Sequence, residues 1–516
     1  MSTNTFITAK LENGDMYSRA FNFLLHLNRL WQEISSPFSC LQQPQSLAFI
    51  WNEQFGRIVM DDRYLSYLRT MLRGKVDFML TEDLVAHPEG AVAKKGDIVN
   101  KEKYHELSQL NLNITLDRCI KIAKPLTPAS IYQTIGKLVS QDPSFQEIDE
   151  NFGKASLLDQ CCDTLKRYPD LLEILTVFKF DAEDLFNQSL LSAYLAYITG
   201  VAAKYSQAKI ESAFLAGLLH DIGLLFIHRN YLDKKKRLTA QEWKNIQLHP
   251  IIAFKLLKDI DGFSVVSRKA ILNHHERPDG SGYPMGKKED RISELGSLIS
   301  LLDDVIVVYN KQFKPFKRTI KNLLPIIQMN TFGYHQPAVT AMIHILKQSK
   351  NQAVENIDKE TVKELINYTY QQQLYINKIM DVIKQINDII GFSHNSKRVT
   401  AIQNIGGKIT SVIASSGLQE SSYIELLQRL TTEDHKELHL EIEETRLMLE
   451  EVIFQLQSYY KAANLFSTRS SSGLAEKIGI FTDIFSATDR PPVPASVAQY
   501  WGSLSSKWTF KQQAVV

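Results

Sequence analysis

The feature that most constrains the fold is a predicted helix, 209–219, that is apolar on almost every side. Such a helix has no face suited to water, so it lies in the interior of a protein. It delivers His220 and Asp221 at its C-terminal end, inside the protein. Burying an unpaired polar group costs free energy. His220 and Asp221 therefore need partners, and a metal ion would supply one.

Three further groups of metal-ligand residues follow along the chain. They share a position beside a predicted helix end or within an apolar helix: His249, His274-His275 and Asp303-Asp304. Of the acidic pair we expect Asp304 to be the ligand, because it would share the inward side of its helix with Leu301 and Val305. Imidazoles combined with a bridging carboxylate suit iron, manganese or zinc. A metal of this kind acidifies a bound water for phosphoester hydrolysis.

The length of the chain predicts several domains. A chain of 516 residues is too long for one core, and roughly two to four domains are expected. The fold class is mainly α, with a small β-containing N-terminal region and a helical C-terminal extension. We expect an N-terminal input or packing region at 1–125 and a helical connector at 126–171. A metal-binding helical domain follows at 172–348. The last region, 349–516, is expected to be helical, with a coiled-coil-like segment and a loose tail.

Composition argues against several classes of protein. The net charge of +2 makes no case for non-specific binding of a nucleic-acid polymer. Cys161 and Cys162 are adjacent, which favours reduced thiols over a disulfide. The chain does not begin with a charged start followed by an apolar run, and no uncharged apolar stretch approaches the ~20 residues of a membrane span. We therefore expect a cytoplasmic protein without a membrane span.

Local patterns predict the elements around the central domain. Residues 76–80 alternate as a short strand does, and Asn100 is suited to cap a helix that begins at Lys101. Thr239 and Glu242 have the spacing of a capping box. Apolar residues that step by three and four positions predict a coiled-coil seam: Leu438, Ile442, Thr445, Leu449, Val452 and Leu456. This seam packs either within the chain, as a helical hairpin, or against a second copy or another partner protein.

These motifs resemble those of the HD-GYP family, the metal-dependent HD phosphohydrolases that linearise cyclic di-GMP in bacteria. The segment 220–223 matches the HD motif, His249-Pro250 a later ligand segment, and 274–284 the segment that ends in Gly-Tyr-Pro. Asp304 falls where the last Asp ligand of the family lies. Residues 314–317, Lys-Pro-Phe-Lys, resemble the Arg-Pro-Tyr-Arg segment that contacts substrate phosphates.

The resemblance covers about residues 172–348 and implies an all-helical HD-type domain with two divalent transition metal ions, iron or manganese. It implies a cyclic dinucleotide as substrate and catalytic roles for Asp221 and His220, with Asp221 bridging the metals. The implied metal ligands, with Asp184 as a further candidate, are His220, Asp221, His249, His274, His275 and Asp304. The implied substrate contacts are Lys314, Lys317, Tyr283, Gly282 and Arg277.

Three positions depart from the pattern of the family. Gln188 stands where the family has a His ligand, four residues after Asp184 and on the same helix face. Leu224 replaces a Lys, and Val307 replaces a second Asp. These departures leave two other hypotheses open. Either the domain is degenerate and binds metal, nucleotide or a partner without turnover, or it is an HD hydrolase that acts on another nucleotide.

Overall fold

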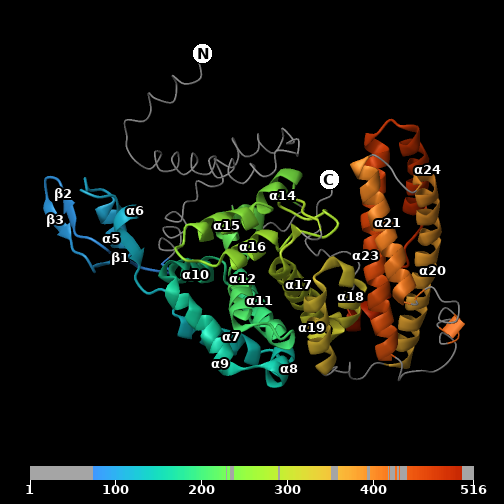
Figure 1. Cartoon of the computed structure of the whole chain (residues 1–516), viewed down its shortest axis with the longest axis horizontal. Coiled ribbons are helices and arrows are strands. Elements are labelled where there is room, and N and C mark those ends of the chain that lie inside the picture. The colour runs from blue at the N-terminus through green and yellow to red at the C-terminus, as the bar shows by residue number, and fades with distance from the viewer. Residues whose placement is uncertain are drawn as a thin grey trace, which may run out of the picture. The chain divides into compact units, whose positions relative to one another are not determined.

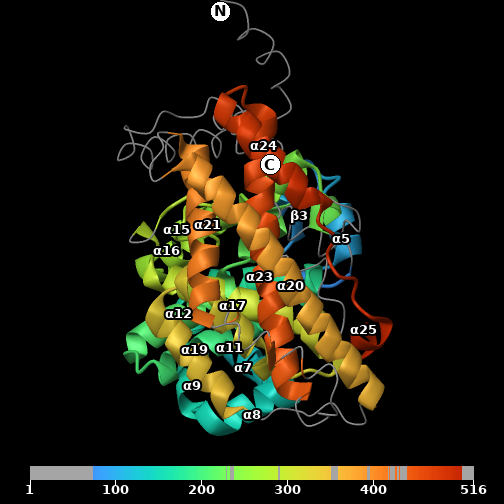
Figure 2. The same cartoon turned by 90° about the vertical axis from the view of Figure 1, so that its right-hand side faces the viewer.

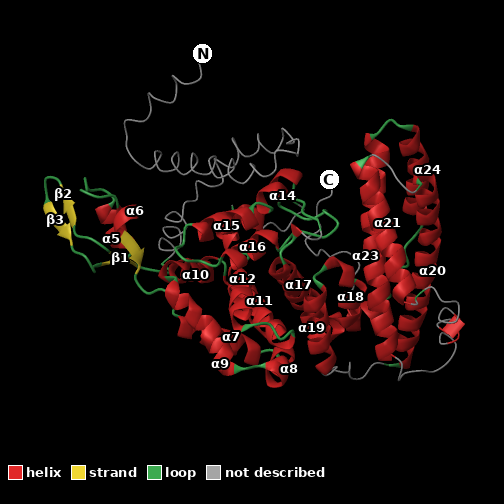
Figure 3. Ribbon diagram, viewed as in Figure 1, coloured by secondary structure: helices red, strands yellow, loops and turns green. Residues whose placement is uncertain are grey.

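The structure is a computed structural model that describes residues 74–227, 229–232, 238–288, 291–349, 358–391, 396–416 and 439–501, with Leu418, Glu425, Leu426 and Arg429. Residues 1–73, most of the predicted N-terminal input or packing region, lie outside these residues. Within the described part the chain is mainly α, as predicted (Figures 1 and 3). No helix of that part is long and apolar enough to cross a bilayer.

Contacts between residues divide the chain into two units that alternate along the sequence. The first unit contains the described residues up to Leu126, Asp170–Glu183 and Ile222–Ile252. The second contains Thr127–Pro169, Asp184–Asp221 and the described residues from Ala253 onward. The predicted domains were continuous stretches of sequence, whereas these units are interleaved.

Two small antiparallel sheets lie in the first unit and confirm the predicted β-containing region. The strands β1 (Phe78–Leu80), β4 (Ile98–Val99) and β5 (Ile120–Ile122) form one sheet with β1 in the middle, and Phe78 is opposite Val99 and Ile122. The other sheet pairs β2 (Leu84–Ala86) with β3 (Gly90–Ala93). Phe78 and Leu80 are buried because alternate residues of a strand point to one face.

Helices of the first unit begin where the capping signals predict. Helix α5 (Lys101–Leu107) is capped by Asn100, whose side chain accepts from the Lys103 amide. Helix α14 (Ala240–Ile246) has the predicted capping box between Thr239 and Glu242. The other described helices of this unit are α6 (Leu116–Cys119), most of α10 (Pro169–Asp181), a 3-10 helix (Ile222–Phe226), α13 (Arg229–Leu232) and the start of α15 (His249–Lys258).

The second unit contains the buried helices that end at the predicted ligands. Helix α12 (Gln207–Leu219) packs against α16 (Val265–Asn273) and α17 (Glu294–Val308), and its residues from Ala213 to Leu219 are all buried, as predicted. Gly217 permits close contact with α11 (Glu183–Ala202), since an added Cβ would lie 2.8 Å from the Ser192 carbonyl oxygen. Around them lie α7 (Pro128–Ser140), α8 (Pro143–Phe152), α9 (Ala155–Asp163), α18 (Leu324–Met329) and α19 (Gln336–Gln348).

The C-terminal part of the second unit is a bundle of long helices. Helices α20 (Lys359–Ile390), α21 (Lys397–Ser416), α23 (His439–Arg469) and α24 (Gly473–Ala487) pack around one apolar core (Figure 2), and α25 (Ala495–Trp501) contacts α20. The predicted seam is buried in this bundle from Ile442 to Leu456, so it packs within the chain. Leu438 lies outside the described residues. Helix α24 was not predicted, because the Ser-rich and Pro-rich segments on either side of it indicated only linkers.

Candidate metal centre

Three histidines lie where helices end. His220 and His274 are the C-terminal cap residues of α12 and α16, and His249 follows α14 closely. Their exposed fractions are 1%, 0% and 0%. The last four carbonyl groups of a helix have no partner within that helix. Each of these imidazoles therefore lies beside a helix end that needs a hydrogen-bond donor.

The three imidazoles use the same backbone contact. Their Nδ1 atoms lie 2.8, 2.8 and 2.6 Å from carbonyl oxygens three residues earlier: those of Gly217, Ile246 and Ile271. A carbonyl oxygen only accepts, so Nδ1 carries the proton and donates it. The lone pair is then on Nε2, the tautomer that a metal-binding histidine requires, held by a backbone partner.

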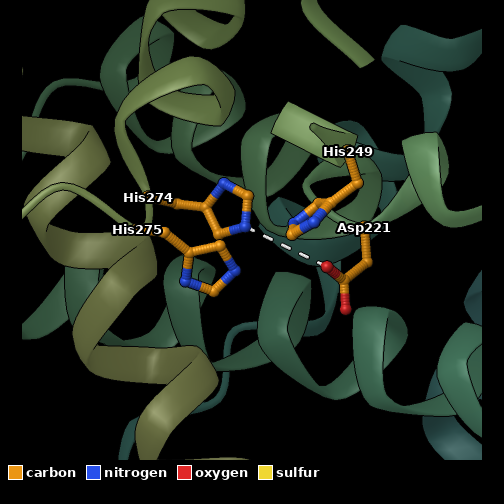
Figure 4. A group of neighbouring side chains, drawn as sticks. All are labelled: Asp221, His249, His274 and His275. Atoms are coloured by element: carbon orange, nitrogen blue, oxygen red, sulfur yellow. Dashed lines mark ion pairs between the residues drawn. The ribbon is translucent and has the colours of Figure 1, made fainter. Parts of the chain in front are cut away.

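Asp221 is the residue that all the ligand candidates share. One group consists of Asp221, His249, His274 and His275, drawn in Figure 4. A second group consists of His220, Asp221 and Asp303. Asp221 Oδ2 lies 3.6 Å from His220 Nε2, and Oδ1 lies 4.0 Å from His274 Nε2. Asp221 thus offers one oxygen toward each group, as a bridging carboxylate does.

The donor set fits divalent transition metals. In each group, one ligand atom per residue lies within 4.8 Å of all the others, and every residue is buried. Ligands at about 2.0–2.2 Å from one ion lie within such distances of one another. Imidazole nitrogens and carboxylates in a buried site are ligands of iron, manganese and zinc. The residues present can therefore hold a metal, with four ligands in one group and three in the other.

The structure differs from the sequence prediction at the acidic pair of α17. Asp303, and not Asp304, joins His220, with Asp303 Oδ1 3.7 Å from His220 Nε2. We predicted Asp304 from the apolar residues on its side of the helix. That argument fails because α17 is buried on every side from Leu298 to Val308, and so has no single inward face there.

Asp304 instead forms a buried ion pair. Its Oδ2 lies 2.7 Å from Arg277 Nη2 and also accepts from the Tyr334 hydroxyl at 2.7 Å, while Arg277 donates to Ser300. Burial raises the pKa of Asp304, and the charge of Arg277 opposes that shift. Burial acts to lower the pKa of Arg277, but the charge of Asp304 and its hydrogen bond outweigh it, so the pKa is raised. Arg277, predicted to contact substrate, is thus already engaged by Asp304.

The loop after His275 is held by Glu276 and Gly282. The buried Glu276 carboxylate accepts from the amides of Met285 and Lys287, each at 2.7 Å. At Gly282 an added Cβ would lie 2.3 Å from the Arg277 amide nitrogen and 2.4 Å from the His275 carbonyl oxygen, so only glycine fits. The Tyr283 ring lies against His275, with centroids 4.6 Å apart. The predicted residues Gly282 and Tyr283 therefore lie directly beside a candidate ligand.

The remaining predicted residues are not members of the two groups. Asp184 is exposed and belongs to neither group. Lys314 forms an ion pair with Asp142, with Nζ and Oδ2 2.7 Å apart. Lys317 is exposed and has a left-handed backbone, with φ of 56°. Of the positions that depart from the family, Gln188 is half-buried, and Leu224 and Val307 are buried.

Sequence reasoning did not assign three residues of this region. Asp303 was named but set aside in favour of its neighbour. Glu276 lies within the segment 274–284 and has no role in the sequence prediction, whereas the structure buries it among backbone amides. Asp142 is the N-cap of α8 and also accepts from the Tyr309 hydroxyl at 2.9 Å. No local pattern links residues so distant in sequence.

Comparisons with known proteins identify the family that the central part of the chain resembles. Residues 178–330 match the family described as HD domain. The chain is similar to a cyclic di-GMP phosphodiesterase of Pseudomonas aeruginosa, with 30% identity over 29% of this chain and 36% of that protein. It is similar to a 3'3'-cGAMP-specific phosphodiesterase of Vibrio cholerae, with 39% identity over 17% of this chain and 19% of that protein. It is also similar to a cyclic di-GMP phosphodiesterase of Thermotoga maritima, with 32% identity over 22% of this chain and 30% of that protein. The matches thus span about a third or less of these relatives.

Proposed function

We propose that this chain, whose residues 178–330 match the HD domain family, is a metal-dependent phosphodiesterase of the HD-GYP type that hydrolyses a cyclic dinucleotide, with cyclic di-GMP as the first candidate. The observation that carries the proposal is the position of Asp221 in both ligand groups. The relatives in Pseudomonas aeruginosa and Thermotoga maritima are named for cyclic di-GMP, and one in Vibrio cholerae for 3'3'-cGAMP. The proposed location is the cytoplasm, as expected from the sequence.

The residues of the two groups would have different tasks. Asp221, His249, His274 and His275 would hold one divalent ion, and His220, Asp221 and Asp303 a second, with iron or manganese proposed for both. Bound ions of this kind supply Lewis acidity and lower the pKa of water. The Nδ1 contacts to backbone carbonyls hold the imidazole planes fixed, and burial excludes bulk water. Both effects favour charge stabilisation at a preorganised site.

Substrate recognition would fall to the loop after His275 and to Lys317. Gly282 holds the loop backbone against residues 275–277, and Tyr283 presents its ring beside His275. Lys317 is exposed, and the described residues show no ion-pair partner for it, so its ammonium is available for a phosphate. Lys314 would have to give up Asp142 before it could bind an anion.

The proposal is tested on anaerobically purified protein by metal analysis and by product analysis with cyclic di-GMP and 3'3'-cGAMP on the same sample. We expect two ions per chain and a linear or mononucleotide product. Asp221→Asn is expected to lower kcat by roughly 10²–10³-fold, as removal of a group that stabilises transition-state charge does. His344→Ala, at an exposed histidine of α19, is the matched control. Full activity of Asp221→Asn would refute the proposal.

One observation favours a second function, a domain that binds metal or nucleotide and signals without turnover. Gln188 and the exposed Asp184 leave the group of His220, Asp221 and Asp303 with three ligands, since neither residue lies in it. A metal content of one ion or less, with tight cyclic dinucleotide binding and no product after iron or manganese is added, would identify this function. Gln188→His would then be expected to raise the metal content.

A further inference from the structure

The turn that carries Lys317 joins two uncommon types of helix to a residue with a left-handed backbone. Helix α17 continues into a π-helix (Tyr309–Phe313) and a 3-10 helix (Lys314–Phe316), and Lys317 then takes a left-handed backbone. A non-glycine residue with this backbone costs free energy and persists only where its surroundings hold it. The next residue, Arg318, is 5% exposed. The contacts of the neighbouring residues therefore hold Lys317 in this conformation.

Two anchors hold this turn, one on each side of Lys317. On the first side, Asp142 of the α8 N-terminus accepts from Tyr309 and pairs with Lys314. On the second side, Arg318 forms an ion pair with Glu443 of α23, in the C-terminal bundle. Both charged side chains of the second pair are 3% exposed. Lys317 is the cation of the turn that neither anchor engages.

Glu443 is the counter-charge of Arg318 in the part of the chain that the structure describes. Arg318 Nη2 contacts Glu443, and within the described residues Nε and Nη1 have no hydrogen-bond partner. An ion pair buried this deeply is costly to break, because removing one partner leaves an uncompensated charge. Arg318 would then move toward water, and the strained residue before it would lose its support.

The bundle is well suited to act as a fixed support. Helix α23 is 31 residues long and packs against α20, α21 and α24 over a common apolar core. A second contact joins the same helix to the HD domain, where Gln455 Nε2 donates to Asn330 Oδ1 at 3.3 Å. Twelve residues separate Glu443 from Gln455, about 18 Å along a helix. Two contacts at that separation resist rotation of α23 about either one.

We propose that Glu443 is a positioning residue for the substrate: through Arg318 it fixes the turn 314–318 and places Lys317 to bind a phosphate of the cyclic dinucleotide. This inference rests on the proposed function and extends it beyond residues 178–330, the part that matches the HD domain. It makes the C-terminal bundle part of the substrate site. Any signal that shifts α23 would thereby change substrate affinity.

The test compares Glu443→Gln with Glu444→Gln, a neutralisation at the exposed neighbouring residue. In full-length protein we expect Glu443→Gln to raise KM for the cyclic dinucleotide about tenfold, with kcat and metal content within about twofold of wild type. Amide hydrogen exchange over residues 313–320 should quicken in the same variant. Glu444→Gln should leave KM and exchange unchanged. Arg318→Lys keeps the charge and should give an intermediate KM, and it serves if Glu443→Gln folds poorly.

A double-mutant cycle separates positioning from general loss of structure. Lys317→Ala should raise KM as much as Glu443→Gln does, and the double variant should be no worse than Lys317→Ala alone. Additive effects on KM, or unchanged exchange in Glu443→Gln, would overturn the inference while leaving the proposed function intact. If wild type binds without turnover, the same cycle is run on Kd. Wild-type protein that neither binds nor hydrolyses a cyclic dinucleotide would end both proposals.

Discussion

Replacing Asp304 by Asn is expected to cost stability while leaving the metal content unchanged. Asp304 lies 2.7 Å from Arg277, and the two side chains are only 6% and 13% exposed. Removing one partner of such a pair leaves a buried charge uncompensated, at a cost of about 3–5 kcal/mol. The Asn oxygen can still accept from Tyr334 or Arg277, so we expect a loss near the lower figure.

Asp303→Asn should have the opposite effects, with loss of metal and little loss of stability. Asp303→Asn removes a carboxylate that faces His220 and leaves the Arg277 pair intact. Even loss of an outer partner of a metal ligand lowers metal affinity by about 10–100-fold. We therefore expect Asp303→Asn to lose at least one ion per chain. Its metal-free form should lose less stability than that of Asp304→Asn, because Asp303 faces a histidine rather than the permanently charged Arg277.

Both variants are measured as chelated and as anaerobically metal-loaded protein. Urea unfolding of the chelated samples gives the stability difference without a contribution from bound metal, and mass spectrometry gives the ions per chain of the loaded samples. The reasoning is refuted if Asp304→Asn loses the metal with unchanged urea stability while Asp303→Asn retains it. That outcome would restore Asp304 as the ligand and place Asp303 in a supporting role.

Three further substitutions have expected outcomes. Gly282→Ala should lower both the melting temperature and the metal content, because its Cβ would meet backbone at 2.3 Å. Glu276→Gln should reduce urea stability by about 1–3 kcal/mol, since one amide oxygen cannot serve the Met285 and Lys287 amides as two carboxylate oxygens do. Burial lowers the pKa of Lys255 from 10.5 to about 7, so the unfolded chain binds more protons between those values and wild-type stability rises with pH across them. Lys255→Met should therefore stabilise by roughly 2–4 kcal/mol at pH 6 and by progressively less toward pH 10 in urea titrations.

Local chemistry made much of the fold predictable from the sequence. Asn100 and Thr239 cap the helices that they were expected to cap, and α12 is buried because it is apolar on almost every side. The periodic seam of α23 also predicted burial correctly from Ile442 onward. Helix α24 was missed, although Ser472 caps it by accepting from the Ala475 amide. The Ser-rich and Pro-rich segments on either side of α24 predicted linkers, and one capping residue was too weak a signal to predict a helix between them.

The candidate site was predictable where short motifs contain its residues. His220, Asp221, His249, His274 and His275 were chosen from sequence, and the structure brings them together around Asp221. The partners of Asp304 and Lys314 were not predictable, because they depend on contacts between distant segments. Asp142 lies in the predicted helical connector, 126–171, for which the sequence predicts no part in the site. Glu443 lies outside the resemblance altogether.

The Nδ1 contacts of the three candidate ligand histidines have a consequence for natural selection. Each imidazole completes the hydrogen bonding of a helix end, at Gly217, Ile246 or Ile271, whether or not an ion is present. A descendant that had lost catalysis would still be under pressure to keep these histidines, since their loss exposes unpaired carbonyls in a buried place. Comparisons among related chains should therefore give more weight to the carboxylates than to the histidines when sorting active domains from inactive ones.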